Sequence, residues 1–143
     1  MAVSSGVFPC YENQFQIKAG NSYATIADCE TFGVAFDNGV EEWTPFESEG
    51  WVRRLKTAMG VTISVSGKRN IGDAGNDYVS ELSLKNGQAA QADFKWTFPD
   101  GTIVEFANAV INVTNNLGGD ATNVAPLEFE VLSNGKPTIT SAS

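Results

Sequence analysis

Alternation of apolar and polar residues, interrupted by turn residues, is the feature that most constrains the fold of this chain. Residues 61–69 are the clearest case, because valine and isoleucine at every second position place one apolar face on an extended strand. Residues 92–98 and 102–114 flank Pro99-Asp100-Gly101, whose residue types favour a tight turn. These two segments are therefore predicted to form a β-hairpin.

Other segments extend this pattern. Further strands are predicted at residues 14–18, 23–27, 31–37, 126–132 and 137–140. Asn38-Gly39, a dipeptide favoured in tight hairpins, is predicted to form a turn after residue 37. One helix is predicted over residues 77–85, with Val79 and Leu82 on its apolar stripe and Asn76 or Asp77 as its cap. The predicted fold class is mostly β with one helix.

The chain has 143 residues, a length that suits a single domain spanning residues 1–143. Residues 1–13 show little periodicity and are expected to form an N-terminal arm. Residues 40–60 contain Pro45, which argues against a central strand, so we predict a long loop or hairpin with one short element at residues 51–57. No apolar run reaches the roughly 18 residues of a membrane span. The N-terminus lacks the pattern of a secretory signal, so free thiols are expected at Cys10 and Cys29.

Charge is unevenly distributed along the chain. The net charge is −8, with acidic residues concentrated between residues 28 and 49 and basic residues between residues 53 and 69. An acidic protein is a poor binder of nucleic acid, because that affinity comes from Lys and Arg that neutralise phosphates. Adjacent acidic and basic blocks favour docking between copies, in which acid on one subunit meets base on the next.

The composition also limits the possible chemistry. The chain has no histidine, which removes Ser-His, Cys-His and His-metal sites. Paired carboxylates near Trp43 and Trp51 leave a glycosidase cleft as one interpretation and a solvated acidic loop as the simpler one. These carboxylates are Glu41, Glu42, Glu47 and Glu49. Residues 73–77 lack the spacing and distal Glu of a calcium-binding EF-hand loop. We therefore predict no catalytic residue, no metal and no cofactor.

Three tryptophans raise the question of a sugar-stacking platform. Trp96 alternates with Phe94 and Phe98 and is predicted to lie in the core. Trp43 and Trp51 lie on the charged segment, where a large apolar ring must be buried against its own domain or against a neighbour. The sequence leaves both possibilities open.

A set of short motifs follows in a fixed order between residues 31 and 140. The motifs are Glu41-Glu42-Trp43-Thr44-Pro45, Gly50-Trp51-Val52-Arg53-Arg54-Leu55, Ser64-Val65-Ser66-Gly67-Lys68-Arg69, Gly75-Asn76-Asp77-Tyr78-Val79, Phe94-Lys95-Trp96-Thr97-Phe98-Pro99-Asp100-Gly101, Gly118-Gly119-Asp120, Ala125-Pro126-Leu127-Glu128-Phe129 and Gly135-Lys136-Pro137. Taken together, the chain resembles the major tail tube proteins of long-tailed, siphovirus-like bacteriophages. The order of the motifs carries this resemblance, and nothing before Asn21 contributes to it.

The resemblance implies a small β-sandwich flanked by one α-helix and assembled as hexameric rings that stack into a hollow tube. Strands from six subunits would form an inner β-barrel through which DNA passes without specific binding. The resemblance implies no enzyme activity and no cofactor. It also implies a place in the virion tail after synthesis in the bacterial host cytoplasm, with no membrane contact. The implied partners are copies of the chain itself and the tape measure, tail terminator and distal tail proteins.

Two sets of site residues follow as expectations. Residues 40–60 are expected to join neighbouring subunits, with candidates Glu41, Glu42, Trp43, Trp51, Arg53, Arg54 and Lys56. The bore is expected to be acidic so that DNA phosphates do not adhere, and its candidates on the long strands are Asp93 and Glu105. The main alternative function is a carbohydrate-binding β-sandwich module.

Overall fold

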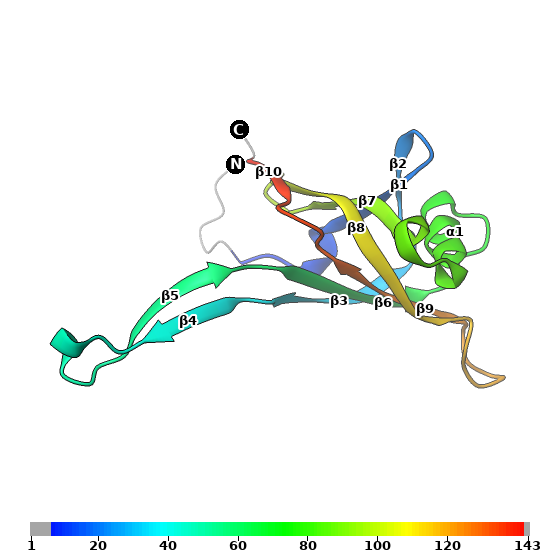
Figure 1. The fold of residues 1–143 in the computed structure, drawn as a ribbon. Helices are drawn as coiled ribbons and strands as arrows, with labels where there is room; N and C mark the ends of the chain where they lie inside the picture. The colour runs from blue at the N-terminus through cyan, green and yellow to red at the C-terminus, as the bar shows by residue number, and fades with distance from the viewer. Residues whose placement is uncertain (1–6, 142–143) are drawn as a thin grey trace.

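The computed structural model describes residues 7–141, and antiparallel strands dominate it (Figure 1). The strands of the main sheet are β1 (Gln14–Ala19), β2 (Ser22–Thr25), β3 (Cys29–Phe36), β6 (Val61–Lys68), β7 (Gln91–Thr97), β8 (Ile103–Asn116), β9 (Pro126–Leu132) and β10 (Thr138–Thr140). Their order is β2-β1-β7-β8-β9-β6-β3, and β10 pairs with the start of β8. A separate two-stranded sheet contains β4 (Gly39–Trp43) and β5 (Arg53–Ala58). The mostly-β fold class is confirmed.

The main sheet folds over itself into an open sandwich. Strand β8 has 14 residues, and it pairs with β7 along its first half and with β9 along its second half. A register shift between β7 and β8 and a left-handed backbone at Asn108 (φ 54°) lie between the two halves, where such irregularities bend a strand. The first layer therefore contains β2, β1, β7 and the start of β8. The second layer contains the end of β8 with β9, β6 and β3.

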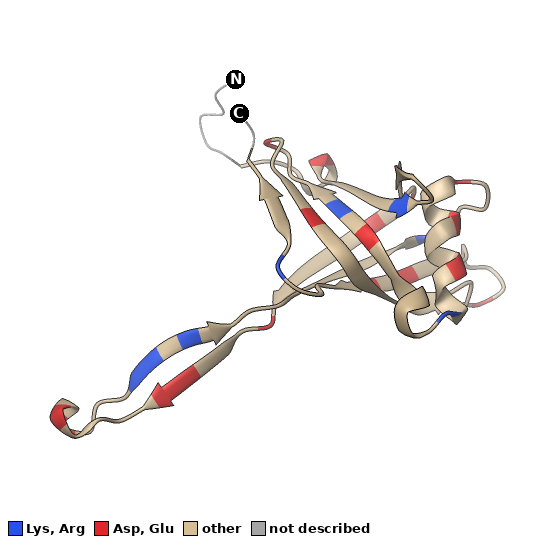
Figure 2. Ribbon diagram, turned by 45° about the horizontal axis from the view of Figure 1, so that its top comes forward, with Lys and Arg blue, Asp and Glu red and all other residues tan. Residues whose placement is uncertain are grey.

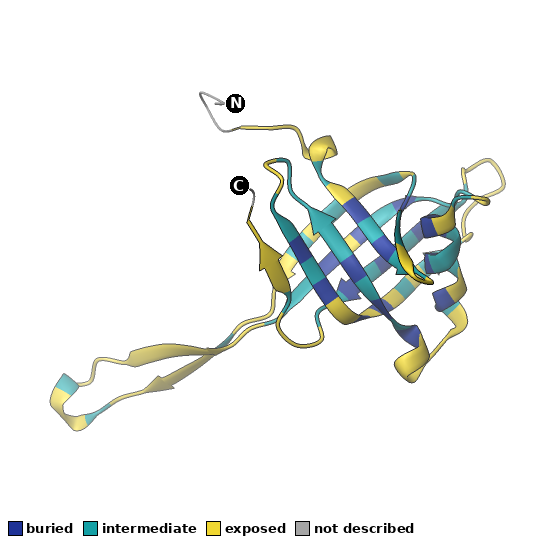
Figure 3. Cartoon of the chain, turned by 90° about the horizontal axis from the view of Figure 1, so that it is seen from above, coloured by how far each residue is buried: buried dark blue, intermediate teal, exposed yellow. Residues whose placement is uncertain are grey.

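Buried residues alternate with more exposed ones along these strands (Figure 3), and the buried residues form the core between the layers. The largest fully buried side chains include Phe94 and Phe129. The Phe15 ring of β1 lies 4.9 Å from the Phe32 ring of β3, so strands that are distant in the sheet order meet across the interior. Trp96 packs against the same cluster, as predicted, and its Nε1 donates a hydrogen bond to the half-buried Oδ1 of Asn13 at 2.9 Å.

The helix α1 (Ala74–Glu81) packs beside β1 and β2 and begins three residues earlier than predicted. Asp73 caps it by accepting a hydrogen bond from the backbone N–H of Asn76 at 3.0 Å. The prediction of Asn76 or Asp77 as the cap was wrong, because Asn76 is buried and Asp77 forms an ion pair with Arg69 at 2.8 Å. That contact with Arg69 is the main cause of the lowered pKa of Asp77. Val79 and Leu82 are buried, as predicted.

The prediction of a tight turn at Asn38-Gly39 was wrong. Strand β3 instead runs on into β4, and β5 returns into β6, so that residues 29–68 form one long ribbon (Figure 1). The N–H of Asp37 donates to the carbonyl of Gly60 at 2.8 Å and links the two parts of this ribbon. Gly39 is needed for close packing, because a Cβ on it would lie 2.9 Å from the Cβ of Ala58. The other predicted strands and the turn at residues 99–101 are confirmed.

Short helical turns complete the described chain. They are η1 (Cys10–Glu12), η2 (Phe46–Ser48), η3 (Leu82–Leu84) and η4 (Gly87–Ala90). Of the expected N-terminal arm, residues 1–6 lie outside the described residues, and residues 7–13 are mostly exposed and contain η1. Between residues 7 and 141, no helix combines the length and the apolar character that a membrane crossing requires.

Candidate functional site

The hairpin of β4 and β5 projects from the sandwich as an arm (Figure 1). We call residues 39–58 the arm. All of the residues in β5 and all but Gly39 in β4 are exposed. The expected loop or hairpin at residues 40–60 is thus a two-stranded ribbon, and the predicted short element at residues 51–57 is strand β5.

The tip of the arm has a defined turn. Ser48 Oγ lies 2.9 Å from the carbonyl oxygen of Pro45 and 2.7 Å from that of Trp51. Glu49 and Gly50 both have left-handed backbone angles, with φ of 53° and 91°, and they reverse the chain after η2. These hydrogen bonds and backbone angles give the tip of the arm a defined conformation, which fixes the position of its side chains.

The two strands of the arm carry opposite charges (Figure 2). Pairing places Glu42 opposite Arg54, and the two side chains form an ion pair at 2.8 Å. Glu41 lies opposite Leu55, and Val40 lies opposite Lys56. The acidic and basic blocks that are neighbours in the sequence thus become neighbouring strands. Both partners of the ion pair are more than half exposed, so we assign it little stability.

The aromatic residues of the arm lack burial in their own domain. Trp51 is 79% exposed, and the Phe46 side chain is fully exposed at the tip. The Trp43 ring is also exposed, and the guanidinium carbon of Arg53 lies 5.7 Å from its centroid. Burial against the chain's own domain, one of the two possibilities left open by the sequence, therefore does not hold for Trp43 and Trp51.

The lumen candidates Asp93 and Glu105 lie on the outward face of the first layer, where cations accompany them. Asp93 accepts a hydrogen bond from the N–H of Asn108 at 2.9 Å and lies 4.0 Å from Lys18 Nζ. Glu105 accepts a hydrogen bond from the Tyr23 hydroxyl at 3.4 Å. Burial, and then the charges of Glu105 and Asp93, raise the pKa of Tyr23.

Lysine completes this group. Lys95 is paired with Glu105 in the β7–β8 register, and its Nζ lies 4.2 Å from the centre of the Tyr23 ring. The two carboxylates of the first outward face are therefore matched by two lysines, Lys18 and Lys95, and this face carries little net charge.

The outward face of the second layer carries a different pair of carboxylates, Glu128 and Glu130 of β9. Their strand neighbours in β6 are Ser66 and Ser64, and Asn112 of β8 donates to Glu130 at 3.1 Å. These two residues were not among the bore candidates predicted from the sequence, which were Asp93 and Glu105. The signal was present, because alternation in residues 126–132 places both on the side opposite the buried Leu127, Phe129 and Val131.

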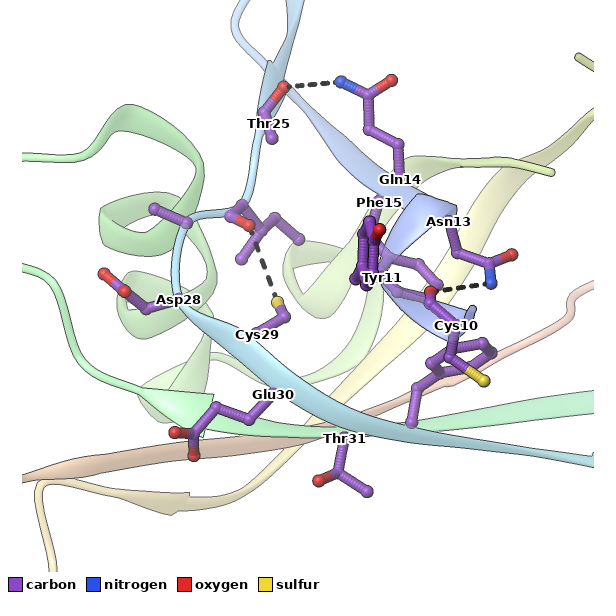
Figure 4. Close-up of a pocket in the computed structure, with 13 residues that line it drawn as sticks. Cys10, Tyr11, Asn13, Gln14, Phe15, Thr25, Asp28, Cys29, Glu30 and Thr31 are labelled. Carbon is purple, nitrogen blue, oxygen red and sulfur yellow. Dashed lines mark hydrogen bonds between the residues drawn. The ribbon is translucent and has the colours of Figure 1, made fainter. Parts of the chain in front are cut away.

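A pocket lies between residues 10–15 and residues 25–32, and both cysteines line it (Figure 4). Cys29 Sγ donates to the carbonyl of Ile26 at 3.6 Å. Burial, and then the carboxylates of Asp28 and Asp73, raise the pKa of the Cys29 thiol to about 12. A neutral thiol is a poor nucleophile. Within the part of the chain that the structure describes, both cysteines are free, and no three ligand-type side chains gather as a metal site.

The sequence matches no protein-family model and no curated protein. Solved structures, in contrast, match along nearly the whole chain. A chain from the tail of an empty gene transfer agent (GTA) particle, determined with helical refinement and C6 symmetry, has a TM-score of 0.75 at 19% identity. The match covers 94% of this chain and all of that chain.

Two further structures come from other assemblies. A chain of the sheath–tube complex of the PVC extracellular contractile injection system has a TM-score of 0.66 at 13% identity, covering 99% of this chain and all of that one. A chain of the anti-feeding prophage tube-terminating cap has a TM-score of 0.58 at 18% identity, with the same coverage. At these identities the likeness shows the fold, and this chain has the fold of subunits from such tails, tubes and caps, as its resemblance to tail tube proteins implied.

Proposed function

We propose that this chain is a structural subunit of a tail tube in a phage or phage-like particle. The observation that carries the proposal is its full-length fold likeness to a chain from a GTA tail with C6 symmetry. On this proposal, six copies form a ring, rings stack into a hollow tube, and the assembled tail is where the protein resides. Its further partners are the tape measure, tail terminator and distal tail proteins.

The arm is proposed as the joint between copies. A two-stranded ribbon is marginally stable by itself in water, and this one exposes Trp51, Phe46 and Leu55. An open strand edge is also a template for pairing with another chain. Burial of the arm against a neighbouring copy would cover these apolar side chains and give the open strand edges a partner. Its contact residues are those expected from the sequence, namely Glu41, Glu42, Trp43, Trp51, Arg53, Arg54 and Lys56.

The bore is proposed to conduct DNA past an acidic wall. Acidic walls favour release, because basic walls would bind the duplex through counterion release. We place this wall on the outward face of the second layer, since Glu128 and Glu130 lie there among small polar side chains and the nearby Lys68 forms its ion pair with Glu30. Asp93 and Glu105 mark the alternative wall on the first layer, where Lys18 and Lys95 offset their charge.

No catalytic role is proposed. The carboxylates that would be needed for glycoside cleavage are exposed along the arm and at its tip, and the two free thiols belong to a pocket without a base such as histidine. The structural role requires neither a metal nor a cofactor.

Negative-stain electron microscopy of the purified protein tests the proposal. We expect rings with sixfold symmetry in class averages, and stacks of these rings at high protein concentration. Dispersed monomers that bind a glycan array would instead support the carbohydrate-binding alternative. Glycoside cleavage that disappears in a Glu41→Gln, Glu42→Gln, Glu47→Gln or Glu49→Gln variant would overturn the non-enzymatic role.

A further inference from the structure

The arm has two open edges of opposite charge. In the described chain, β4 pairs only with β5 and β5 only with β4, so each strand has one edge without a partner strand. Strand β4 carries Glu41 and Glu42, and strand β5 carries Arg53, Arg54 and Lys56. Because the strands lie side by side, each arm presents an acidic edge on one side and a basic edge on the other (Figure 2).

Arms from two copies could meet in three ways. Pairing of β4 with β4, or of β5 with β5, is a twofold contact that places like charges on neighbouring strands. Like charges opposite one another destabilise a strand pair, and charged edges generally oppose strand pairing. Pairing of β4 with the β5 of a neighbour places acid beside base. Charge therefore selects the third arrangement and works against the first two.

The contact between an acidic and a basic strand already occurs within the arm. Glu42 and Arg54 are paired in register, and their side chains reach each other at 2.8 Å. In a row of arms joined acidic edge to basic edge, each basic strand would lie between two acidic strands. Glu41 lies opposite Leu55, and Trp43 follows two positions after Glu41 on the same strand. Directly paired residues and residues two positions apart share a face, so Trp43 and Leu55 lie on the same face of the arm. The same pairing would therefore bring these apolar side chains close to those of the next arm.

We propose that neighbouring copies join through their arms, with β4 of one copy paired edge to edge with β5 of the next. The inference rests on the proposed function, since it supplies the contact from which a ring is built. A contact of this kind uses different surfaces on the two partners, so it cannot end at a dimer. It continues until rotation closes a ring or translation produces a filament. The partner of the arm is thus a second arm.

Two charge variants test the pairing. The triple variant Arg53→Glu, Arg54→Glu, Lys56→Glu has two acidic edges, and the double variant Glu41→Lys, Glu42→Lys has two basic edges. We expect each variant alone to lose rings and tubes completely, because every edge meets a like charge. An equimolar mixture should assemble again, with the two variants alternating, because each acidic edge can then meet a basic edge.

A charge-swapped variant is the matched control. Glu41→Lys, Glu42→Arg, Arg54→Glu and Lys56→Glu together keep the net charge and the ion pair within the arm but reverse the sign of each edge, because β5 then retains Arg53 as its single cation. We expect this variant to assemble with itself and to exclude the wild type from mixed tubes, measured with two fluorescent labels. Circular dichroism and thermal melting of the swapped variant should match the wild type, because the altered side chains are exposed and opposite charges still face each other within the arm. The triple and double variants place like charges opposite each other within the arm, so their test is recovery of assembly in the mixture.

The outcomes separate the two proposals. Wild-type protein that never forms rings would overturn the proposed function together with the arm pairing. Wild-type tubes beside an equimolar mixture that stays dispersed would overturn the arm pairing alone, and so would either charge variant that assembles unaided. Swapped arms that stay monomeric, or that mix freely with the wild type, would also contradict it.

Discussion

At the scale of single residues, Asn76 ties the helix to two other segments. It is 1% exposed, and its Nδ2 donates to the carbonyls of Ala27 and Lys68, both at 3.0 Å. Its Oδ1 accepts from Arg69 Nη1 at 2.8 Å and from the N–H of Asn70 at 2.9 Å. The amide thus satisfies polar groups that the packing of α1 would otherwise leave without partners.

Replacement of Asn76 by leucine is predicted to destabilise the fold by at least about 3 kcal/mol, because several buried polar groups would each lose a partner. Urea denaturation of the monomer measures this change. Asn134→Ala is the control, since this exposed side chain makes one hydrogen bond to Asn108, and its effect should stay within about 0.5 kcal/mol. A leucine variant as stable as the wild type would show that the network contributes little.

Two strand glycines provide a second comparison. A Cβ on Gly67 would lie 2.1 Å from the carbonyl oxygen of Asp28, whereas a Cβ on Gly33 would meet nothing within 4 Å. We predict that Gly67→Ala costs about 1–3 kcal/mol, as overpacking does elsewhere. Gly33→Ala should be neutral or stabilise by up to about 1 kcal/mol, because it restricts the unfolded chain. Thermal melting of both variants checks the difference, and equal melting temperatures would contradict it.

The cysteines should differ in reactivity. Cys29 has a pKa of about 12, so its thiolate is scarce at neutral pH and increases as the pH rises toward that value. At pH 8 its thiolate fraction should be about a thousandfold below that of a thiol with an ordinary pKa. Mass spectrometry after iodoacetamide treatment should find the exposed Cys10 modified and Cys29 intact. Rapid labelling of Cys29 in a Cys10→Ser variant would contradict the assignment.

At the scale of elements, the arm should matter for assembly and little for folding. Trp51 is exposed at its tip, so Trp51→Ala should change the free energy of unfolding by less than about 0.5 kcal/mol. Loss of an aromatic residue from a buried interface commonly costs about 2 kcal/mol or more, enough to stop growth when repeated at each joint. Sedimentation should therefore find folded monomers. Trp51→Phe, which keeps a ring, should still form tubes, and normal assembly of Trp51→Ala would exclude Trp51 from the joint.

Elements were predictable from the sequence where local chemistry decided them. The turn at residues 99–101 closed as predicted, because Gly101 takes a left-handed angle (φ 95°) and the strands on either side alternate. Asn38-Gly39 has equally favourable turn chemistry, but the chain runs straight on, since β3 pairs with a strand beyond the arm. The start of α1 was also predicted wrongly, because a contact with a distant segment decides it. Gly75 is a poor helix former, yet only a residue without a Cβ can approach Thr25 there.

The candidate site was predictable in composition but not in arrangement. The sequence showed an acidic block followed by a basic block, and the structure places them on paired strands that join Glu42 to Arg54. That pairing depends on the turn at residues 45–51, whose hydrogen bonds no sequence periodicity revealed. The exposure of Trp51 was likewise undecided, because burial depends on where the whole arm lies.

At the scale of the whole molecule, the charge of −8 must be carried by particular faces. The arm carries both acidic and basic residues, which largely offset each other. On the outward face of the first layer, the positive charges of Lys18 and Lys95 offset the negative charges of Asp93 and Glu105. The second outward face has Glu128 and Glu130 beside serines and an asparagine, and its Lys68 forms an ion pair with Glu30 at 3.2 Å. If one of these faces lines a bore, the second gives DNA the more repulsive wall.

Tubes of wild-type protein are therefore predicted not to retain duplex DNA at about 10 mM salt, where charges act over roughly 30 Å. Reversal of the wall charge with Glu128→Lys and Glu130→Lys should make tubes sediment together with DNA, and this retention should fall steeply as salt is added, because it depends on counterion release. Asp93→Lys with Glu105→Lys is the matched control, since it makes the same charge change on the first layer. Retention by the control tubes alone would move the wall to Asp93 and Glu105, and retention by wild-type tubes would contradict an acidic bore altogether.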